Sequence, residues 1–214
     1  MTSRTSEAAL RIISAGPGTT LQDAGRHGYL RFGITAAGPM DPLAHATANL
    51  AVGNAPGATA IEVMLGVIEV TAEARPLTVA VAGGDFVISL DGRVLPSAVV
   101  LLMIEPGAVL KIRAGPSGAW CYLAVAGRLI VPQVLGSNAT HTRTSFGGID
   151  GRAIAADDRL HVEPSGAAAA PLGDAVRRWS ASRGRDRRSR TRFRALVPAP
   201  ASATSSALAR RRTA

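Results

Sequence analysis

Short apolar segments separated by turns fill most of the chain from Ala60 onward. These segments are rich in Val, Ile and Leu, as β-strands are: IEVML, VIEVTA, LTVAVA, FVISL, VVLLMI, AVLKI, CYLAVAG and LIVP. About eight short strands with close turns and little helix are typical of a β-barrel or a β-sandwich, not of a parallel α/β sheet. The pattern therefore predicts a mainly β fold.

Turn residues define how these segments are expected to connect. LDGR at 90–93 predicts a hairpin, because Asp-Gly readily adopts positive φ. Pro106-Gly107 lies between two further segments and predicts a second hairpin. ALRIIS at 9–14 predicts an additional strand near the start, and 147–162 predicts a turn followed by the last strand.

One helix is expected, beginning at Asp41-Pro42. Asp suits the N-cap because it accepts hydrogen bonds from first-turn amides, and Pro suits the first helical position. Gly53-Asn54 marks the end. Spacing of i, i+3, i+4 and i+7 predicts an apolar stripe on one face of this helix, made of Leu43, Ala46, Thr47 and Leu50.

The segment Thr19–Pro42 differs from the rest of the chain because glycines alternate there with polar residues. It has too many polar residues for a core strand, and its glycines and prolines would interrupt a helix. Glycines let the backbone approach a ligand closely, and the planar fork of Arg26 suits a carboxylate or phosphate. A structural loop in which Asp23 pairs with Arg26 and Asp41 caps the helix explains the same residues equally well.

Charge divides the chain into two parts. From Arg177 to the end there are 12 arginines and one acid (+11), whereas residues 1–176 hold 12 basic and 14 acidic residues (−2), which sum to the +9 of the whole chain. We expect residues 164–214 to be a disordered tail rich in Arg, Ala, Pro and Ser, because it has little apolar surface to bury. Its composition favours a shifted reading frame or a nonfunctional tail over an RNA-binding arm.

Motifs that indicate common catalytic or metal sites are missing from the sequence. It contains no CxxC, HExxH, Walker A or GxSxG, and its four histidines lack metal-ligand spacing, so no metal site is expected. The single cysteine, Cys121, lies in an apolar run and is expected to be buried. No apolar run has the length of a membrane span, and we expect a cytoplasmic protein.

TTLQDAGRHGYLRFGITAAGPMDPLAHATANLAVGN resembles the signature of the KipA-type proteins. This is the family of the C subunit of 5-oxoprolinase (PxpC), also called the biotin-dependent carboxyltransferase family, urea amidolyase-related proteins or allophanate hydrolase subunit 2. IEVMLG, VAVAGGDF, YLAVAGRL and the segment from VPQVLGSNAT to DDRL continue the resemblance over about residues 10–162. It implies a cyclophilin-like β-barrel over 9–163, and it matches the first of the family's two related halves. We therefore expect a truncated chain whose activity alone is doubtful.

The resemblance also implies a function at the level of a complex. Two partners, KipI-like (the B subunit) and LamB/YcsF-like (the A subunit), would join this chain in cleaving 5-oxo-L-proline to L-glutamate with ATP. One alternative is a carboxyltransferase module of a biotin-dependent urea or amide carboxylase, with biotin carried on another chain. Another is a non-enzymatic KipA-like regulator that binds a KipI-like partner. No nucleic-acid partner is expected.

Candidate site residues follow from the same comparison of motifs. Gln22, Asp23 and Arg26 are candidates for catalysis, since a phosphorylated lactam needs cationic and N–H groups around its anionic oxygens. No general base can be assigned from the sequence. Substrate-binding candidates are Arg26, Gly28, Asn49, Asn54, Glu62, Ser137 and Thr140.

Overall fold

A computed structural model describes residues 7–95 and 99–164 of the chain. The predicted tail from residue 165 on lies outside the described residues. The strands are β1 (Ala9–Ala15), β2 (Thr20–Gln22), β3 (Ala60–Met64), β4 (Val67–Glu73), β5 (Leu77–Gly83), β6 (Phe86–Leu90), β7 (Arg93–Val94), β8 (Val99–Ile104), β9 (Leu110–Ala114), β10 (Trp120–Val125), β11 (Arg128–Leu129) and β12 (Arg159–Glu163). The helices are the α-helix α1 (Pro42–Ala51) and the 3-10 turn η1 (Leu30–Phe32).

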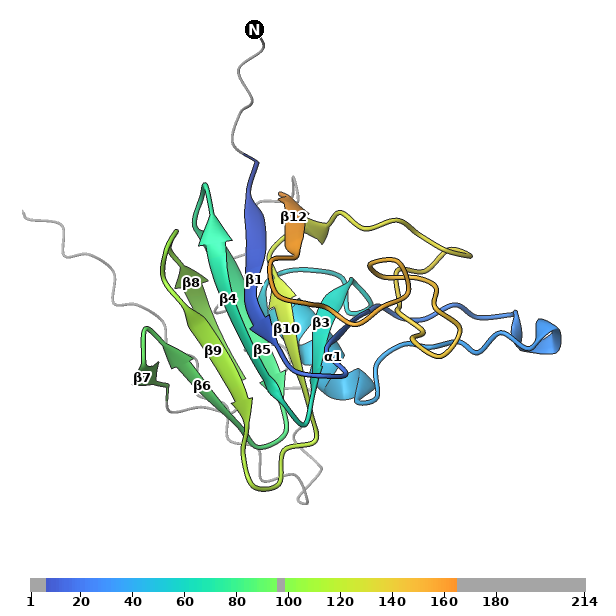
Figure 1. The fold of residues 1–214 in the computed structure, drawn as a ribbon, viewed down its shortest axis with the longest axis horizontal. Helices are drawn as coiled ribbons and strands as arrows, with labels where there is room; N and C mark the ends of the chain where they lie inside the picture. The colour runs from blue at the N-terminus through green and yellow to red at the C-terminus, as the bar shows by residue number, and fades with distance from the viewer. Residues whose placement is uncertain (1–6, 96–98, 165–214) are drawn as a thin grey trace, which may run out of the picture.

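Two antiparallel sheets form the body of the molecule (Figure 1). The larger has the strand order β11-β12-β1-β4-β9-β6-β7, and the smaller has the order β2-β3-β10-β5-β8. The mainly β fold with one α-helix is therefore confirmed. Among the described strands the ladders form two open sheets, not the single closed ladder of a barrel.

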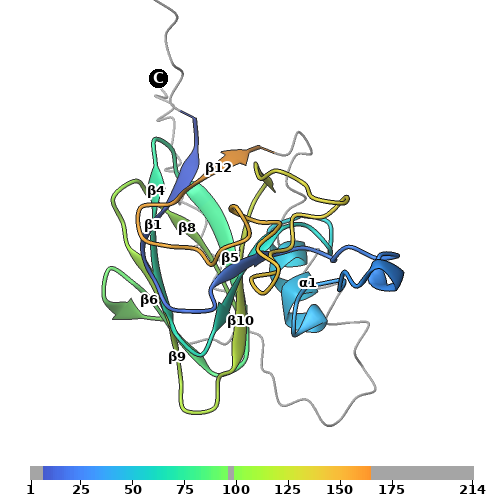
Figure 2. The ribbon, with the colours of Figure 1, turned by 45° about the vertical axis from the view of Figure 1, so that its right-hand side comes forward.

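Alternation along each strand sorts the side chains between two apolar clusters. Residues on one face of each sheet, such as Ile12 and Ile68 in the larger and Ile61 and Leu123 in the smaller, form the main core between the sheets. Cys121 belongs to this core and is buried, as predicted. The other face of the smaller sheet is covered by α1 (Figure 2).

Helix α1 begins and ends as predicted but packs through a different face. Asp41 Oδ1 accepts from the amides of Leu43 (3.1 Å) and Ala44 (3.0 Å), which confirms the N-cap. The predicted stripe is wrong, since Leu43 is 49% exposed. The helix instead buries Ala44, His45, Ala48, Asn49 and Ala51 against a sheet face that contains Ala60, Ala80, Ala82 and Ala124. Small residues on both sides let helix and sheet approach closely.

Three further predictions about strands and turns can be compared with the structure. Asp91 (φ 49°) and Gly92 (φ 78°) form the expected hairpin turn between β6 and β7. The Pro106-Gly107 turn does not form a hairpin, because it joins β8 of the smaller sheet to β9 of the larger one. Within the polar segment Thr19–Pro42, residues 20–22 form the buried strand β2, contrary to expectation, because their polar groups find partners inside the protein.

Candidate functional site

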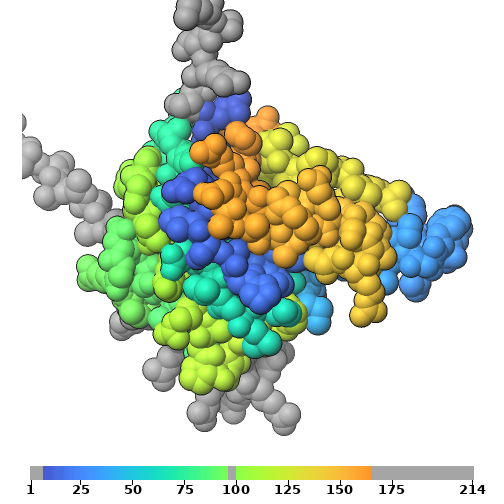
Figure 3. Space-filling model, in the orientation of Figure 1, coloured from blue at the N-terminus to red at the C-terminus, as the bar shows by residue number. Residues whose placement is uncertain are grey.

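The glycine-rich segment leaves the body as a projecting loop, residues 26–36, which we call the arm. Its base is closed by a hydrogen bond from Arg26 N to Ala36 O (2.7 Å). The arm stands away from the sheets (Figure 3) and carries Leu30 and Phe32, which are 76% and 65% exposed. Gly28 lies on the exposed arm, so the structure does not bring this predicted binding residue to the others.

Asp23, at the base of the arm, holds the loop that follows β11. Its Oδ1 accepts from Ser137 Oγ (2.6 Å) and Gly25 N (2.8 Å), and its Oδ2 accepts from Asn138 N (2.6 Å). Each bond is charge-assisted. The predicted pairing of Asp23 with Arg26 is absent from the ion pairs of the described residues.

Gln22 connects β2 to both neighbouring loops. Its Nε2 donates to Thr20 Oγ1 (2.9 Å) and to the carbonyl of Thr140 (3.1 Å). Its Oε1 accepts from Gly38 N (3.0 Å), on the segment that leads into α1. The buried amide thus holds the two loops at a fixed position relative to the sheet.

Arg26 points into the protein and is only 2% exposed. Its guanidinium donates to the carbonyls of Val134 (3.3 Å) and Ala139, and lies over the ring of Phe146 at 4.6 Å from the centroid. Burial lowers the pKa of Arg26, while the charge of Asp23 opposes that effect. One nitrogen, Nη1, is buried and has no hydrogen-bond partner among the described residues. Contact between Arg26 and a ligand would require the 134–147 loop to move.

Gly147 and Gly148 allow this loop to lie directly against Arg26. Both have positive φ (76° and 56°). A Cβ at Gly147 would lie 2.6 Å from Arg26 Nη2, and one at Gly148 would collide with the Thr140 hydroxyl.

We call Gln22, Asp23, Arg26, Ser137, Asn138 and Thr140 the motif cluster.

Asn49 and Asn54 form a second group at the end of α1. Asn49 Nδ2 donates to Ala58 O (2.9 Å), and its Oδ1 accepts from Asn54 Nδ2 (3.3 Å). Asn54 also donates to Val125 O (2.8 Å) and accepts from Gly127 N (3.0 Å). The two amides therefore fix the turn after α1 against the end of β10.

His45 joins this group to the motif cluster. Its Nε2 lies 3.2 Å from the carbonyl of Gln22 and 3.4 Å from Asn49 Nδ2, and the tautomer decides whether it donates to the first or accepts from the second. Burial lowers the pKa of His45, which favours the neutral ring. The ring packs edge-on against Tyr122 at 5.4 Å between centroids.

Glu62 and Tyr122 are register partners on β3 and β10 and face the helix side of the smaller sheet. Tyr122 donates to Glu62 Oε2 (2.7 Å), which also accepts from Met40 N (2.9 Å). Tyr122 in turn accepts from Asp41 N (2.8 Å). Burial raises the pKa of both Glu62 and Tyr122. The pair secures the chain where it enters α1.

A cavity of about 390 Å³ is lined by residues of the motif cluster and of the turn after α1. Its polar wall includes Asp23, Asn54 and Asn138, and its rim comes from the turn after α1 and from residues around β11. Of the predicted site residues, Asp23 and Asn54 line this cavity. Those that do not line it are Gln22, Arg26, Gly28, Asn49, Glu62, Ser137 and Thr140.

Sequence reasoning missed three residues of this region. Asn138 directly follows the predicted site residue Ser137, and this position in the sequence could have identified it. His45 and Tyr122 gave no local signal, because only helix packing and strand register bring them to Gln22 and Glu62. Within residues 7–95 and 99–164, no group of three or more His, Cys, Asp or Glu is placed to hold a metal ion. Over the same ranges, no helix is long and apolar enough to cross a membrane.

Comparison with known proteins identifies the family. The model of the family "Carboxyltransferase domain, subdomain A and B" matches residues 32–210. The chain belongs to this carboxyltransferase family. It is 36% identical over 173 residues to the C subunit of 5-oxoprolinase from Haemophilus influenzae, covering 78% of this chain and 55% of that one. It is 38% identical over 156 residues to the C subunit of 5-oxoprolinase from Escherichia coli, covering 73% and 50%.

A solved carboxyltransferase-family structure shares the fold. The urea amidolyase of K. lactis superposes with a TM-score of 0.68 at 29% identity, covering 73% of this chain and 9% of that one. The chain spans about half the length of the two curated 5-oxoprolinase relatives. The name of those relatives implies an enzyme built from several subunits.

Proposed function

We propose that the chain is part of an ATP-dependent 5-oxoprolinase complex that cleaves 5-oxo-L-proline to L-glutamate. The cavity beside the motif cluster is the observation that carries the proposal. Its volume of about 390 Å³ suits a small five-membered lactam, and its lining includes a carboxylate (Asp23), an arginine (Arg128) and three side-chain amides (Asn54, Gln133 and Asn138). The Asp23 carboxylate would accept from the lactam N–H, and Asn138, whose Nδ2 donates one of its two N–H groups to Val131 O, would donate the other to the lactam C=O.

Pre-organisation of these walls supports the same function. Asp23 is held by three hydrogen bonds, and Asn54 by bonds to α1 and to the end of β10. Groups fixed before the substrate arrives bind it without a further ordering cost. In this proposal ATP binds at the level of the complex, and the KipI-like and LamB/YcsF-like partners supply the rest of the catalytic site.

Complementation of an E. coli strain that lacks its own C subunit of 5-oxoprolinase tests the proposal. The full chain should restore ATP-dependent formation of glutamate from 5-oxoproline in the lysate. Asp23→Asn should lower that rate about tenfold, because the variant keeps the shape and removes the acceptor charge. Asp85→Asn is the matched control, since Asp85 also accepts from a serine, Ser117, but lies away from the cavity.

Similarity to urea amidolyase favours a second candidate, a carboxyltransferase module acting on urea or a similar amide. Avidin separates the two candidates, because it blocks only a reaction that depends on biotin. ATP-dependent turnover of 5-oxoproline that persists with avidin supports the first candidate. Turnover that requires urea and is abolished by avidin supports the second. Binding to a KipI-like partner without either turnover would leave the regulatory role.

A further inference from the structure

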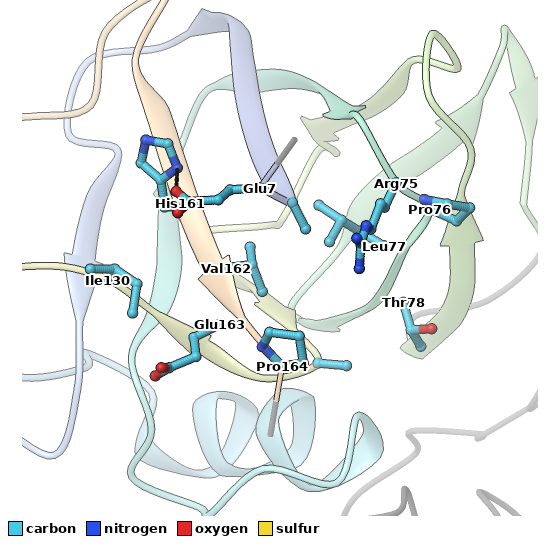
Figure 4. Close-up of a pocket in the computed structure, with 12 residues that line it drawn as sticks. Glu7, Arg75, Pro76, Leu77, Thr78, Ile130, His161, Val162, Glu163 and Pro164 are labelled. Carbon is cyan, nitrogen blue, oxygen red and sulfur yellow. Dashed lines mark ion pairs between the residues drawn. The ribbon is translucent and has the colours of Figure 1, made fainter. Parts of the chain in front are cut away.

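A second cavity lies around the start of β5, and Ala126 and Ile130, which flank β11, also line it. It has a volume of about 680 Å³, within the range of small-molecule sites. Apolar side chains of β5, β12 and the segment after β11 line much of it, including Leu77, Ile130 and Val162 (Figure 4). We call this cavity the Arg75 groove; it shares no lining residue with the cavity beside the motif cluster.

Arg75 is exposed and lines this groove without a carboxylate partner in the described part of the chain. The neighbouring acid in the sequence, Glu73, is already engaged by Arg11 (3.3 Å) and Arg159 (3.1 Å). Of the two acids of the groove, Glu163 is paired with Arg128 (2.5 Å), and Glu7 lies 3.5 Å from the imidazole of His161. Arg75 is therefore the cation of the groove whose charge no described acid neutralises.

The backbone before Arg75 fixes its position. Ala74 has a φ of 65°, which is uncommon for a residue other than glycine, and Arg75 N donates to Glu73 O (2.8 Å). This tight turn between β4 and β5 places Arg75 at the groove in Figure 4, next to Leu77. A cation and an apolar surface are thus adjacent.

We propose that the Arg75 groove binds a free small carboxylate with an apolar body, of the size of a medium-chain alkyl acid. Arg75 would bind the carboxylate in a bidentate manner, and Leu77, Ile130 and Val162 would contact the alkyl chain. An anion is favoured because Arg75 forms no ion pair with a described acid, whereas Glu163 at the groove is paired with Arg128. The proposal is independent of the function proposed above.

Calorimetric titration of the full chain with octanoate tests this site, with octan-1-ol as the neutral probe. Octanoate should bind to the unaltered chain. Arg75→Gln should weaken octanoate binding about tenfold and leave octanol binding unchanged, because only the charge-assisted bond is lost. Ile130→Ser should weaken both probes.

Arg93→Gln is the matched control, since Arg93 is another exposed arginine, on β7 at the opposite edge of the larger sheet. Its octanoate binding should equal that of the unaltered chain. Absence of octanoate binding to the unaltered chain would overturn the proposal. Equal losses in the Arg75 and Arg93 variants would also overturn it, since they would show a general charge effect. Circular dichroism of each variant verifies that it is folded.

Discussion

Arg26 and Arg75 show how differently this fold uses two arginines. Arg26 belongs to the family signature, is buried, and donates to backbone carbonyls of the 134–139 loop. Arg75 belongs to no motif recognised in the sequence, is exposed, and has no acidic partner among the described residues. The comparison teaches that a residue of the family signature can be fully used in structural hydrogen bonds, while a residue outside every recognised motif can remain without an acidic partner.

Replacing Arg26 should destabilise the fold much more than replacing Arg75, and this is the largest effect that we expect. Arg26→Ala leaves two loop carbonyls without a donor and a gap beside Phe146, so it should lower the free energy of unfolding by about 3 kcal/mol. Arg75→Ala should change it by less than about 0.5 kcal/mol. Urea denaturation of both variants measures the contrast. Similar losses in the two variants would show that Arg75 also supports the fold.

The buried carboxyl group of Glu62 should make the free energy of unfolding depend on pH. Burial raises the pKa of Glu62 in the folded chain, so on raising the pH the unfolded chain releases this proton first. The free energy of unfolding should therefore fall as the pH rises from the ordinary range of a glutamate through the raised pKa. The slope is at most about 1.4 kcal/mol per pH unit for one group.

Subtracting the profile of Glu62→Gln isolates this contribution. The groups around Glu62 are Tyr122, Asp41 and His45, and they remain in both chains. His45 acts with the opposite sign, since burial lowers its pKa and its share of stability is lost as the pH falls. Glu105→Gln is the control, since Glu105 is exposed and belongs to none of the ion pairs of the described residues. A difference profile for Glu62→Gln as flat as that of the control would contradict the assignment.

The arm should give the smallest effect. Its base is held by buried groups, but Leu30 and Phe32 at its tip are exposed. Serine at either position should change the free energy of unfolding by less than about 0.5 kcal/mol. Thermal melting of both variants measures this. A loss above about 1 kcal/mol would show that the tip packs against the body.

The predictions that proved wrong mostly involve residues whose partners are distant in the chain. Leu43 fits a helical apolar stripe, yet small residues occupy the buried face because α1 packs on an alanine-rich sheet. Pro106-Gly107 is typical of a hairpin turn, but a turn signal does not tell which sheet each flanking strand joins. Residues 20–22 look too polar for a strand because their partner, Thr140, is more than a hundred positions away.

The sequence by itself determined the local elements and the family. Alternating apolar residues specify strands, Asp41-Pro42 specifies the helix start, and Asp91-Gly92 specifies a hairpin, because each depends on neighbours along the chain. The tertiary structure alone decided which polar residues are already bonded and which remain free. Asp23 meets Ser137, Glu62 meets Tyr122, and Arg75 meets no described acid, because sheet register and loop packing bring together residues that no sequence spacing relates.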